Sequence, residues 1–330
     1  MDRSAVPPPV TQVMDAAQAW LPARMARVEQ LLEGAVEGHG ERLGDDARAT
    51  LEAGGKRLRP MLVLLSAGPS AGAAALHAAA AIELVHMATL VHDDVLDAAP
   101  LRRGLPTVVA ISGRDRATAV GDLLLSRAFA ELAESDQGGE RQVELLAGAS
   151  VGLALGELAQ RRDAFDLTIS ADRYRERCVL KTARLFECAC LIGRVGARDD
   201  PAAGPLRVFG RQIGLAFQLL DDVLDVAGPP ERTGKARGTD LLDGTVTLPL
   251  ILARERDSRL AELDLRALDA REAERVCDRI VATGALEEAR ADAAAKVAEA
   301  KDAIAGEPSL DEAQRRLLAL VADGVVERYS

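Results

Sequence analysis

Aromatic residues make up only 2% of this chain of 330 residues, and long Val/Ile/Thr alternations are missing. Both are typical of strands, so their scarcity gives no support to a sheet-based core. The residues that dominate many windows, Ala, Leu, Arg and Glu, are strong helix formers. The composition therefore predicts an all-α fold.

Cysteine is also scarce. The four cysteines, Cys178, Cys188, Cys190 and Cys277, form no CxxC pair and match no zinc-site spacing. We expect reduced, buried thiols in a cytosolic protein. A general excess of positive charge is absent as well, since the net charge is −11. This excludes nucleic acid as a general partner, although a local basic cluster would still suffice for an anionic substrate.

A signal sequence and a clear membrane span are two further absences. Residues 1–9 lack a charged-then-apolar pattern and are predicted to be a flexible tail. Residues 61–82 carry no Asp, Glu, Lys or Arg, but Gly68-Pro69-Ser70 interrupts them. We therefore predict two core helices joined by a turn, no integral membrane segment and a cytoplasmic location.

Apolar periodicity predicts a series of helices and no linker between domains, so residues 10–330 are expected to form one domain. Helices are expected at 10–36, from 56–60 onward, and at 72–97, 115–135, 141–162, 171–196 and 204–226. A long polar loop follows from Gly228 to Gly244. Near the C-terminus, Ser309 and Glu312 have the spacing of a capping box.

The most informative feature is a pentapeptide, Asp-Asp-Val-Leu-Asp, which occurs at 93–97 and again at 221–225. Each copy follows an apolar helical run, and the first and fifth residues of each share one helix face. Two carboxylates ~5 Å apart repel by roughly 3 kcal/mol at an effective dielectric of ~20. Clusters of this kind need a cation, and Mg²⁺ prefers carboxylates together with substrate phosphates. The motif predicts two acidic walls that hold Mg²⁺ against a diphosphate.

Cationic groups that suit phosphate are spaced along the same region. They are Lys56, Arg57, Arg59, Arg102, Arg103, Lys181 and Lys235. A single Asp motif is usually a solvated helix face, and an Arg-Arg pair is usually a surface pair. Paired Asp motifs reverse that preference, and Lys181 lies in an apolar run where an unpaired ammonium would be costly. The set matches the demand of two diphosphates.

Taken together, these residues resemble the trans-isoprenyl diphosphate synthases, the polyprenyl synthetase family, from about Gly54 to Leu252. The matching motifs are residues 55–60, 92–97, 101–104, 121–122, 156–157, 181–183, 217–222, 234–235 and 238–240. The resemblance implies an all-α isoprenoid-synthase bundle of roughly ten core helices around a deep central cavity, assembled as a homodimer. It implies head-to-tail condensation of isopentenyl diphosphate with an allylic diphosphate (dimethylallyl, geranyl, farnesyl or geranylgeranyl) to an all-trans polyprenyl diphosphate.

The resemblance also implies roles for individual residues. Isopentenyl diphosphate would be held by Lys56, Arg59, His86 and Arg103. The allylic diphosphate would be held by Arg102, Lys181, Thr182, Gln218 and Lys235. Asp93, Asp97, Asp221 and Asp225 would bind Mg²⁺, with three ions once diphosphate is present, and Asp94 and Asp222 would support them. Catalysis would depend chiefly on Asp93, Asp97, Lys181, Asp221 and Lys235, which neutralise the leaving group in a dry cavity.

Two positions bear on substrate and product. Thr245 stands where family members commonly have a lysine, which puts one diphosphate contact in doubt unless Lys235 or Arg237 compensates. The residues four and five before Asp93 are Thr89 and Ala88, both small, with Leu84, Ala81 and Ala78 further up the helix. Small side chains leave room for a long tail and favour a product of C30 or beyond, unless Leu84, Leu125 or Phe129 closes the pocket earlier.

Three alternatives use the same residues differently. A class I terpene cyclase would ionise one prenyl diphosphate and would not need Lys56, Arg59, His86 and Arg103. A non-catalytic subunit of a heteromeric synthase would tend to lose an Asp motif, and both are intact here. An Asp-rich helical scaffold without activity would not explain Lys181, Thr182 and Gln218.

Overall fold

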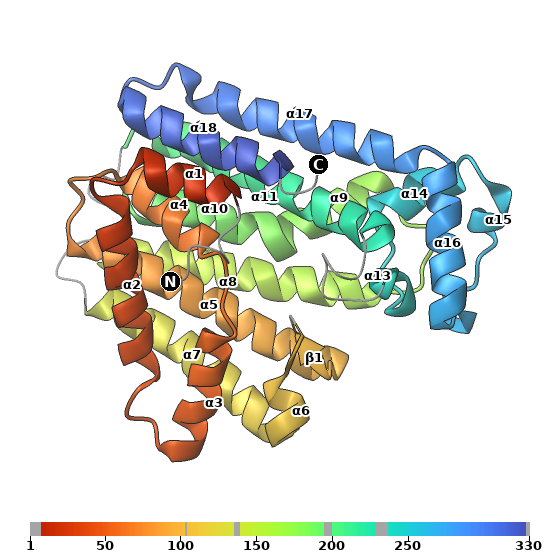
Figure 1. Cartoon of the computed structure of the whole chain (residues 1–330), viewed down its shortest axis with the longest axis horizontal. Coiled ribbons are helices and arrows are strands. Elements are labelled where there is room, and N and C mark those ends of the chain that lie inside the picture. Colours follow the sequence, from red (N-terminus) through yellow and green to blue (C-terminus); the bar gives the residue numbers. More distant parts are fainter. Residues whose placement is uncertain (1–7, 103, 135–138, 195–199, 229–236, 328–330) are drawn as a thin grey trace.

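A computed structural model describes residues 8–102, 104–134, 139–194, 200–228 and 237–327 (Figure 1). Helices account for most of them, so the predicted all-α fold is confirmed. Among the described residues, the strands are limited to β1 (Leu101–Arg102) and β2 (Leu105–Pro106), an antiparallel pair in which Arg102 faces Leu105. Residues 1–7 of the predicted tail lie outside the described residues, and the first helix begins at Pro8.

The N-terminal half carries the first Asp motif at the end of its fifth helix. Its helices are α1 (Pro8–Ala16), α2 (Leu21–Val36), α3 (Glu41–Glu52), α4 (Leu58–Ala67), α5 (Ala73–Asp97), α6 (Val108–Ser112), α7 (Arg114–Ala133) and α8 (Gly139–Arg162). The prediction at 72–97 agrees with α5 within a residue. The stretch before it, 61–82, is α4, a turn and the start of α5, as predicted.

The C-terminal half carries the second Asp motif and then a layer of covering helices. Its elements are α9 (Ala171–Cys178), the π-helical turn η2 (Val179–Ala183), α10 (Arg184–Ile192), α11 (Ala203–Ala227), α13 (Thr239–Leu242), α14 (Leu248–Arg254), α15 (Ser258–Ala261), the 3₁₀ turn η3 (Leu265–Ala267), α16 (Ala270–Ala282), α17 (Ala285–Ala305) and α18 (Glu312–Glu327).

The two halves meet around a central group of long helices. In Figure 1, α5 and α7 run side by side, α8, α10 and α11 cross the middle, and α17 and α18 cover α11. One hydrophobic cluster runs from Val13 to Val325. Residues 78–81 of α5 are all alanines and all fully buried, so neighbouring helices can approach that helix closely. The single domain over residues 10–330 stays a prediction.

The predicted helix at 10–36 is wrong in one respect, because it is broken at residues 17–20 into α1 and α2. Pro22 lies in the first turn of α2, where its missing N–H costs nothing. In the interior of a longer helix, that ring would clash with the carbonyl four residues earlier. The chain therefore turns at Ala17–Trp20 before α2 begins.

The capping box predicted at Ser309 and Glu312 is also wrong by two residues. The amide of Gln314 donates to Asp311 Oδ1 at 2.7 Å, and the amide of Asp311 donates to Gln314 Oε1 at 3.4 Å. Ser309 donates its hydroxyl to Glu307 instead. Asp is as good an N-cap as Ser, so the local sequence offered two registers, and the structure uses the later one.

Two described helices, α5 and α8, are long and apolar enough to span a membrane by composition alone. In α5, 67% of the apolar window is buried inside the fold, which identifies a core helix. In α8 only 33% is buried, which leaves an apolar face on the outside of the molecule. The four cysteines are free and buried, as predicted.

Candidate active site

The first Asp motif forms the end of α5, where Ala98 in the left-handed region (φ 48°) terminates the helix. Asp93 is partly buried, and desolvation raises its pKa to about 6 against the opposing effect of Lys181 and Arg102. Asp97 is half exposed. Asp94 is buried and accepts from Arg102 Nε at 2.8 Å. The first and fifth carboxylates of the motif are thus more accessible than the second.

The second Asp motif repeats this burial pattern at the end of α11. Asp221 is exposed, and Asp225 accepts the backbone N–H of Asp240 at 3.3 Å. Asp222 is buried, and burial raises its pKa well above its usual range. Its two oxygens accept from the hydroxyl of Tyr174 at 2.5 Å and from Gln218 Nε2 at 2.7 Å. The second carboxylate of each motif is thus buried and hydrogen-bonded within the protein, Asp94 to Arg102 and Asp222 to Tyr174 and Gln218.

Lys181 and Thr182 lie on η2, a π-helical turn where the sequence predicts a straight helix over 171–196. Such turns insert one extra residue and are frequent at functional sites. Two glycines let the neighbouring helices approach this turn. A Cβ on Gly156 of α8 would lie 2.5 Å from the backbone nitrogen of Lys181, and a Cβ on Gly214 of α11 would lie 2.6 Å from Ala183 Cα. The turn is therefore clamped between α8 and α11.

Side-chain contacts connect the two motifs through this turn. Thr182 donates its hydroxyl to Gln218 Oε1 at 2.6 Å, one helical turn before Asp222. Lys181 Nζ lies 2.5 Å from Glu157 Oε2. Glu157 Oε1 forms an ion pair with Arg161 Nε at 3.0 Å, and Arg161 Nη2 donates to Asp97 Oδ1 at 2.9 Å. The path runs without a break from the end of α5, through α8 and η2, to α11.

The segment before α4 and the first turn of that helix carry three predicted cations, Lys56, Arg57 and Arg59. Arg57 takes a left-handed conformation (φ 48°), and its side chain is buried against Glu29 at 2.9 Å and Glu83 at 3.0 Å. It therefore anchors the segment, while Lys56 on one side of it is partly exposed. The Arg59 guanidinium lies 4.5 Å above the ring of Phe186, which stacks at 5.5 Å on Phe217 next to Gln218.

A cavity of about 160 Å³ lies among α3, α5 and the β1–β2 hairpin. His86 and Arg102 both line it, together with Gly54 from the segment that carries Lys56. Two predicted phosphate-binding residues thus share one cavity with the glycine turn. Arg103 and Lys235, the remaining predicted residues, lie outside the described residues. The deep central cavity that the family resemblance implies stays a prediction.

Magnesium suits the residues that both motifs present. Asp93, Asp97, Asp221 and Asp225 offer only hard carboxylate oxygens, which Mg²⁺ prefers. Burial raises the pKa of Asp93 by more than the nearby Lys181 and Arg102 lower it, so a divalent ion would stabilise the ionised form. A soft metal is disfavoured, because burial raises the pKa of the nearby Cys178 thiol to about 12.

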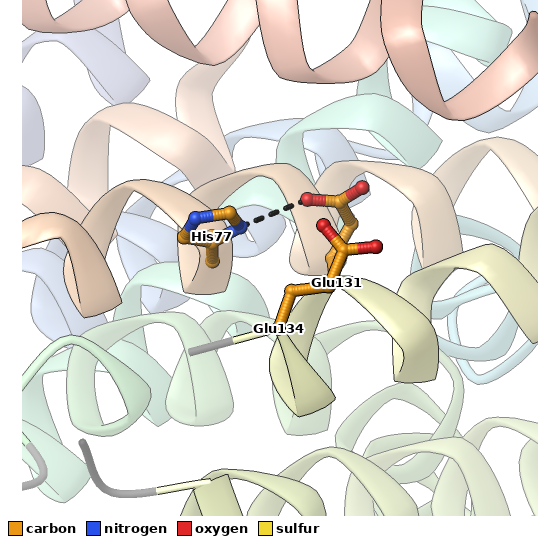
Figure 2. A group of neighbouring side chains, drawn as sticks. All are labelled: His77, Glu131 and Glu134. Carbon is orange, nitrogen blue, oxygen red and sulfur yellow. Dashed lines mark hydrogen bonds and ion pairs between the residues drawn. The ribbon is translucent and has the colours of Figure 1, made fainter. Parts of the chain in front are cut away.

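Figure 2 shows a second group of side chains that could hold a metal ion, His77 of α5 with Glu131 of α7 and Glu134 directly after that helix. His77 Nδ1 lies 3.0 Å from Glu131 Oε2. Arg127 already pairs with Glu131 at 3.2 Å and with Glu134 at 3.7 Å, which neutralises much of the negative charge. His77 precedes Asp93 by 16 residues, so the group lies ~24 Å along α5 from the Asp motif. The group of His77, Glu131 and Glu134 therefore connects α5 with the C-terminal end of α7 and lies far from the first Asp motif.

Comparison with known proteins connects this geometry to a family. The model of the polyprenyl synthetase family matches residues 41–283. The chain is 40% identical over 243 residues to heptaprenyl diphosphate synthase component 2 of Geobacillus stearothermophilus, which covers 73% of this chain and 75% of that protein. It is 34% identical over 319 residues to nonaprenyl diphosphate synthase of Mycobacterium tuberculosis, 93% of each chain. The chain belongs to the polyprenyl synthetase family.

The fold agrees with that assignment. A polyprenyl synthase from Caulobacter crescentus, solved with calcium and isoprenyl diphosphate, has a TM-score of 0.89 and 36% identity and covers 97% of this chain and 98% of its own. This polyprenyl synthetase is therefore a prenyltransferase, a prenyl diphosphate synthase that joins isopentenyl and allylic diphosphates. The predicted family, enzyme class and reaction are confirmed.

Sequence reasoning missed three residues of the site in this polyprenyl synthetase. Glu157 lies in the motif at 156–157 but has no predicted role there, and no motif contains Arg161 or Tyr174. The spacing of Glu157 and Arg161, four residues apart on a helix, was the available signal for an ion pair. Nothing in the sequence places Tyr174 next to Asp222, because 48 residues separate them.

Proposed function

We propose that this enzyme is a Mg²⁺-dependent, long-chain, all-trans polyprenyl diphosphate synthase and that its active site is the region between the ends of α5 and α11. The observation that carries the proposal is the contact path from Asp97 through Arg161 and Glu157 to Lys181, and from the adjacent Thr182 to Gln218. It brings the two acidic motifs, a lysine and hydrogen-bonding groups to one region. The calcium and isoprenyl diphosphate in the Caulobacter relative support a divalent ion with a prenyl diphosphate.

In this proposal the metal ions are held by Asp93, Asp97, Asp221 and Asp225. Three ions are bound once the diphosphate is present. Mg²⁺, when bound, neutralises the charge that develops on the allylic diphosphate as its C–O bond breaks. Lys181 and Lys235 bring positive charge to the same oxygens, and Arg102, Thr182 and Gln218 orient them.

Isopentenyl diphosphate is assigned to the cationic segment before α4 and its neighbours. Lys56, Arg59, His86 and Arg103 are the proposed ligands. Arg57 positions this segment, because its buried pairs with Glu29 and Glu83 fix the backbone from which Lys56 and Arg59 project. Such a site must exclude water, which would otherwise quench the allylic cation.

Removal of an acidic wall tests the proposal directly. Asp93→Ala or Asp221→Ala should each lower turnover at least ~100-fold, because the metal loses a ligand while α5 and α11 keep their packing. The assay is incorporation of labelled isopentenyl diphosphate with several allylic primers, alongside circular dichroism. Asp302→Ala, an exposed position on α17, is the control and should leave turnover unchanged. Full activity in either motif variant would refute the metal-binding role.

The same assay separates the alternatives. A class I terpene cyclase would release a cyclic hydrocarbon from one prenyl diphosphate and would not consume isopentenyl diphosphate. A partner subunit of a heteromeric synthase would be inactive alone, a possibility that the "component 2" in the name of one relative keeps open. Elongation by the pure protein would exclude both, and an inactive protein would exclude the proposed function.

Product length is assigned from the small, buried residues that precede Asp93 on α5. Ala78, Ala81 and Ala88 are buried, and Thr89 turns its hydroxyl back to the His86 carbonyl at 2.8 Å. We propose that the growing chain passes along this face and reaches C30 or longer. Ala88→Phe should shorten the main product by several isoprene units, as sized from the dephosphorylated alcohols, and Ala88→Ser should not. An unchanged distribution in Ala88→Phe would mean that Ala88 does not line the path.

The quaternary structure is assigned from the exposed apolar side of α8. Val151, Leu155 and Leu158 lie on one face of this helix at intervals of four and three residues and are 52–63% exposed. A large exposed apolar face marks an interaction site, and a second copy of the chain would cover it symmetrically. We propose a homodimer through α8, in the cytoplasm.

A further inference from the structure

Arg161, a cation near the C-terminal end of α8, lies beside the proposed metal-binding region and has no role assigned so far. Arg161 ends the contact path at Asp97, with Nη2 2.9 Å from Asp97 Oδ1. Its side chain is 40% exposed and that of Asp97 is 48% exposed, so both are open to a ligand from solution. An ion pair between such accessible groups is weak, and a divalent ion at Asp97 would readily displace it.

Glu157 fixes where this guanidinium lies. Its two oxygens serve different cations: Oε2 pairs with Lys181 at 2.5 Å and Oε1 with Arg161 Nε at 3.0 Å. Glu157 is mostly buried, with 15% of its side chain exposed, and Gly156 beside it holds α8 against η2. The spacing between the lysine and the arginine is therefore set by one carboxylate on a clamped helix.

We propose that Arg161 is a further diphosphate-binding residue of this enzyme and that Glu157 positions it. A divalent ion bound by Asp97 would compete with Arg161 Nη2 for that carboxylate, while Nε would keep its ion pair with Glu157. The Nη2 edge of the guanidinium would then be available to donate to a diphosphate oxygen. An arginine stays charged at any working pH and donates two hydrogen bonds in a plane, which suits a phosphate oxygen pair. This inference rests on the proposed function.

The surroundings of Thr245 give this role added weight. The amide of Phe165, four residues after Arg161, donates to the Gly244 carbonyl at 2.7 Å, so the end of α8 contacts the segment that carries Thr245. Arg237, a candidate to compensate for the absent lysine there, instead contacts the Val226 carbonyl at 2.8 Å and Asp278 at 3.0 Å. Arg161 supplies positive charge from the α8 side.

The test is calorimetric titration of inorganic pyrophosphate into the full-length protein in excess Mg²⁺, a readout independent of turnover. Arg161→Gln should weaken pyrophosphate binding by ~10-fold, the range of one charge-assisted hydrogen bond. Arg162→Gln is the matched control, because it removes the same charge from the adjacent exposed position on α8. It should change the dissociation constant less than twofold.

The opposite results are equally clear. An unchanged pyrophosphate affinity in Arg161→Gln, or an equal loss in Arg162→Gln, would overturn the inference. So would tighter Mg²⁺ binding without any loss of pyrophosphate affinity, since Arg161 would then only neutralise Asp97. If the unaltered protein makes polyprenyl product and Arg161→Gln binds pyrophosphate normally, this inference fails alone. If the unaltered protein neither binds pyrophosphate nor makes product, the proposed function fails with it.

Discussion

Within each Asp-Asp-Val-Leu-Asp motif, the position of a carboxylate on its helix decides its chemistry. Asp94 and Asp222 are buried and held by Arg102 and by Tyr174. The first and fifth residues are more accessible, although Asp93 is still dehydrated enough for its pKa to reach about 6. Identical side chains thus divide into accessible carboxylates and buried, hydrogen-bonded ones because their positions around the helix direct them to different surroundings.

The raised pKa of Asp93 predicts a pH dependence of stability in the metal-free protein. Its folded pKa of about 6 exceeds the unfolded value of 3.8, so between these values the folded state holds more protons. Stability is therefore highest below about pH 4 for this group and falls as the pH rises through 6, by roughly 3 kcal/mol at most. Asp93→Asn, which stays neutral, should lack this loss.

Urea unfolding in EDTA at several pH values between 4.5 and 7.5 measures the effect. The free energy of unfolding of Asp93→Asn should exceed that of the unaltered protein by an amount that grows from pH 4.5 to about 6 and then levels off. Asp302→Asn, at an exposed site, should follow the unaltered protein at every pH. Parallel curves for Asp93→Asn and the unaltered protein would contradict a raised pKa at this position.

Among the elements, η2 depends most on its neighbours. Its π-helical turn lies between Gly156 and Gly214, which approach its backbone more closely than any side chain permits. Gly156→Ala would put a methyl group 2.5 Å from the backbone nitrogen of Lys181, so α8 and η2 must separate. We expect a loss of about 1–3 kcal/mol in stability. Lys181 and Glu157 would move apart, and turnover should fall at least ~10-fold.

Thermal unfolding and the prenyl transfer assay measure these two effects. Gly34→Ala is the control, because a Cβ there meets no atom within 4 Å and α2 gains a better helix former. It should keep full turnover and unfold at the same or a slightly higher temperature. Normal turnover in Gly156→Ala would show that the close approach of α8 does not position Lys181.

At the scale of the whole molecule, the apolar face of α8 predicts how copies assemble. Leu155→Lys would place a charge in the middle of a face that the proposed homodimer buries, so the dimer should dissociate at micromolar concentration. Light scattering after gel filtration gives the mass directly. Val281→Lys, an exposed apolar position on α16, should leave the mass unchanged. A monomeric unaltered protein would refute the homodimer.

Dissociation would also bear on activity. α8 carries Leu155 on its outer face and Glu157 and Arg161 on the side that contacts Lys181 and Asp97. A partner on α8 would therefore stabilise the helix that connects the two Asp motifs. We expect Leu155→Lys to lower turnover along with the mass, and recovery of both at high protein concentration would support this coupling.

The sequence alone determined the helical class, the family, the two acidic motifs and the prenyl transfer reaction. These follow from helix propensity, from short motifs and from the i, i+4 geometry, which depend on neighbours along the chain. The break at Ala17–Trp20 and the capping register at Asp311 were local too, yet each depended on a choice between competing local preferences.

Only the tertiary structure decided which groups meet across long separations. The pairing of Tyr174 with Asp222, the inward turn of Arg57 and the path from Asp97 through Arg161 and Glu157 to Lys181 join residues from different helices. The π-helical turn at Lys181 is of the same kind, because two glycines on other helices shape it. Such contacts depend on how the helices fit together in shape and charge in three dimensions. Patterns among neighbouring residues of the sequence do not predict them.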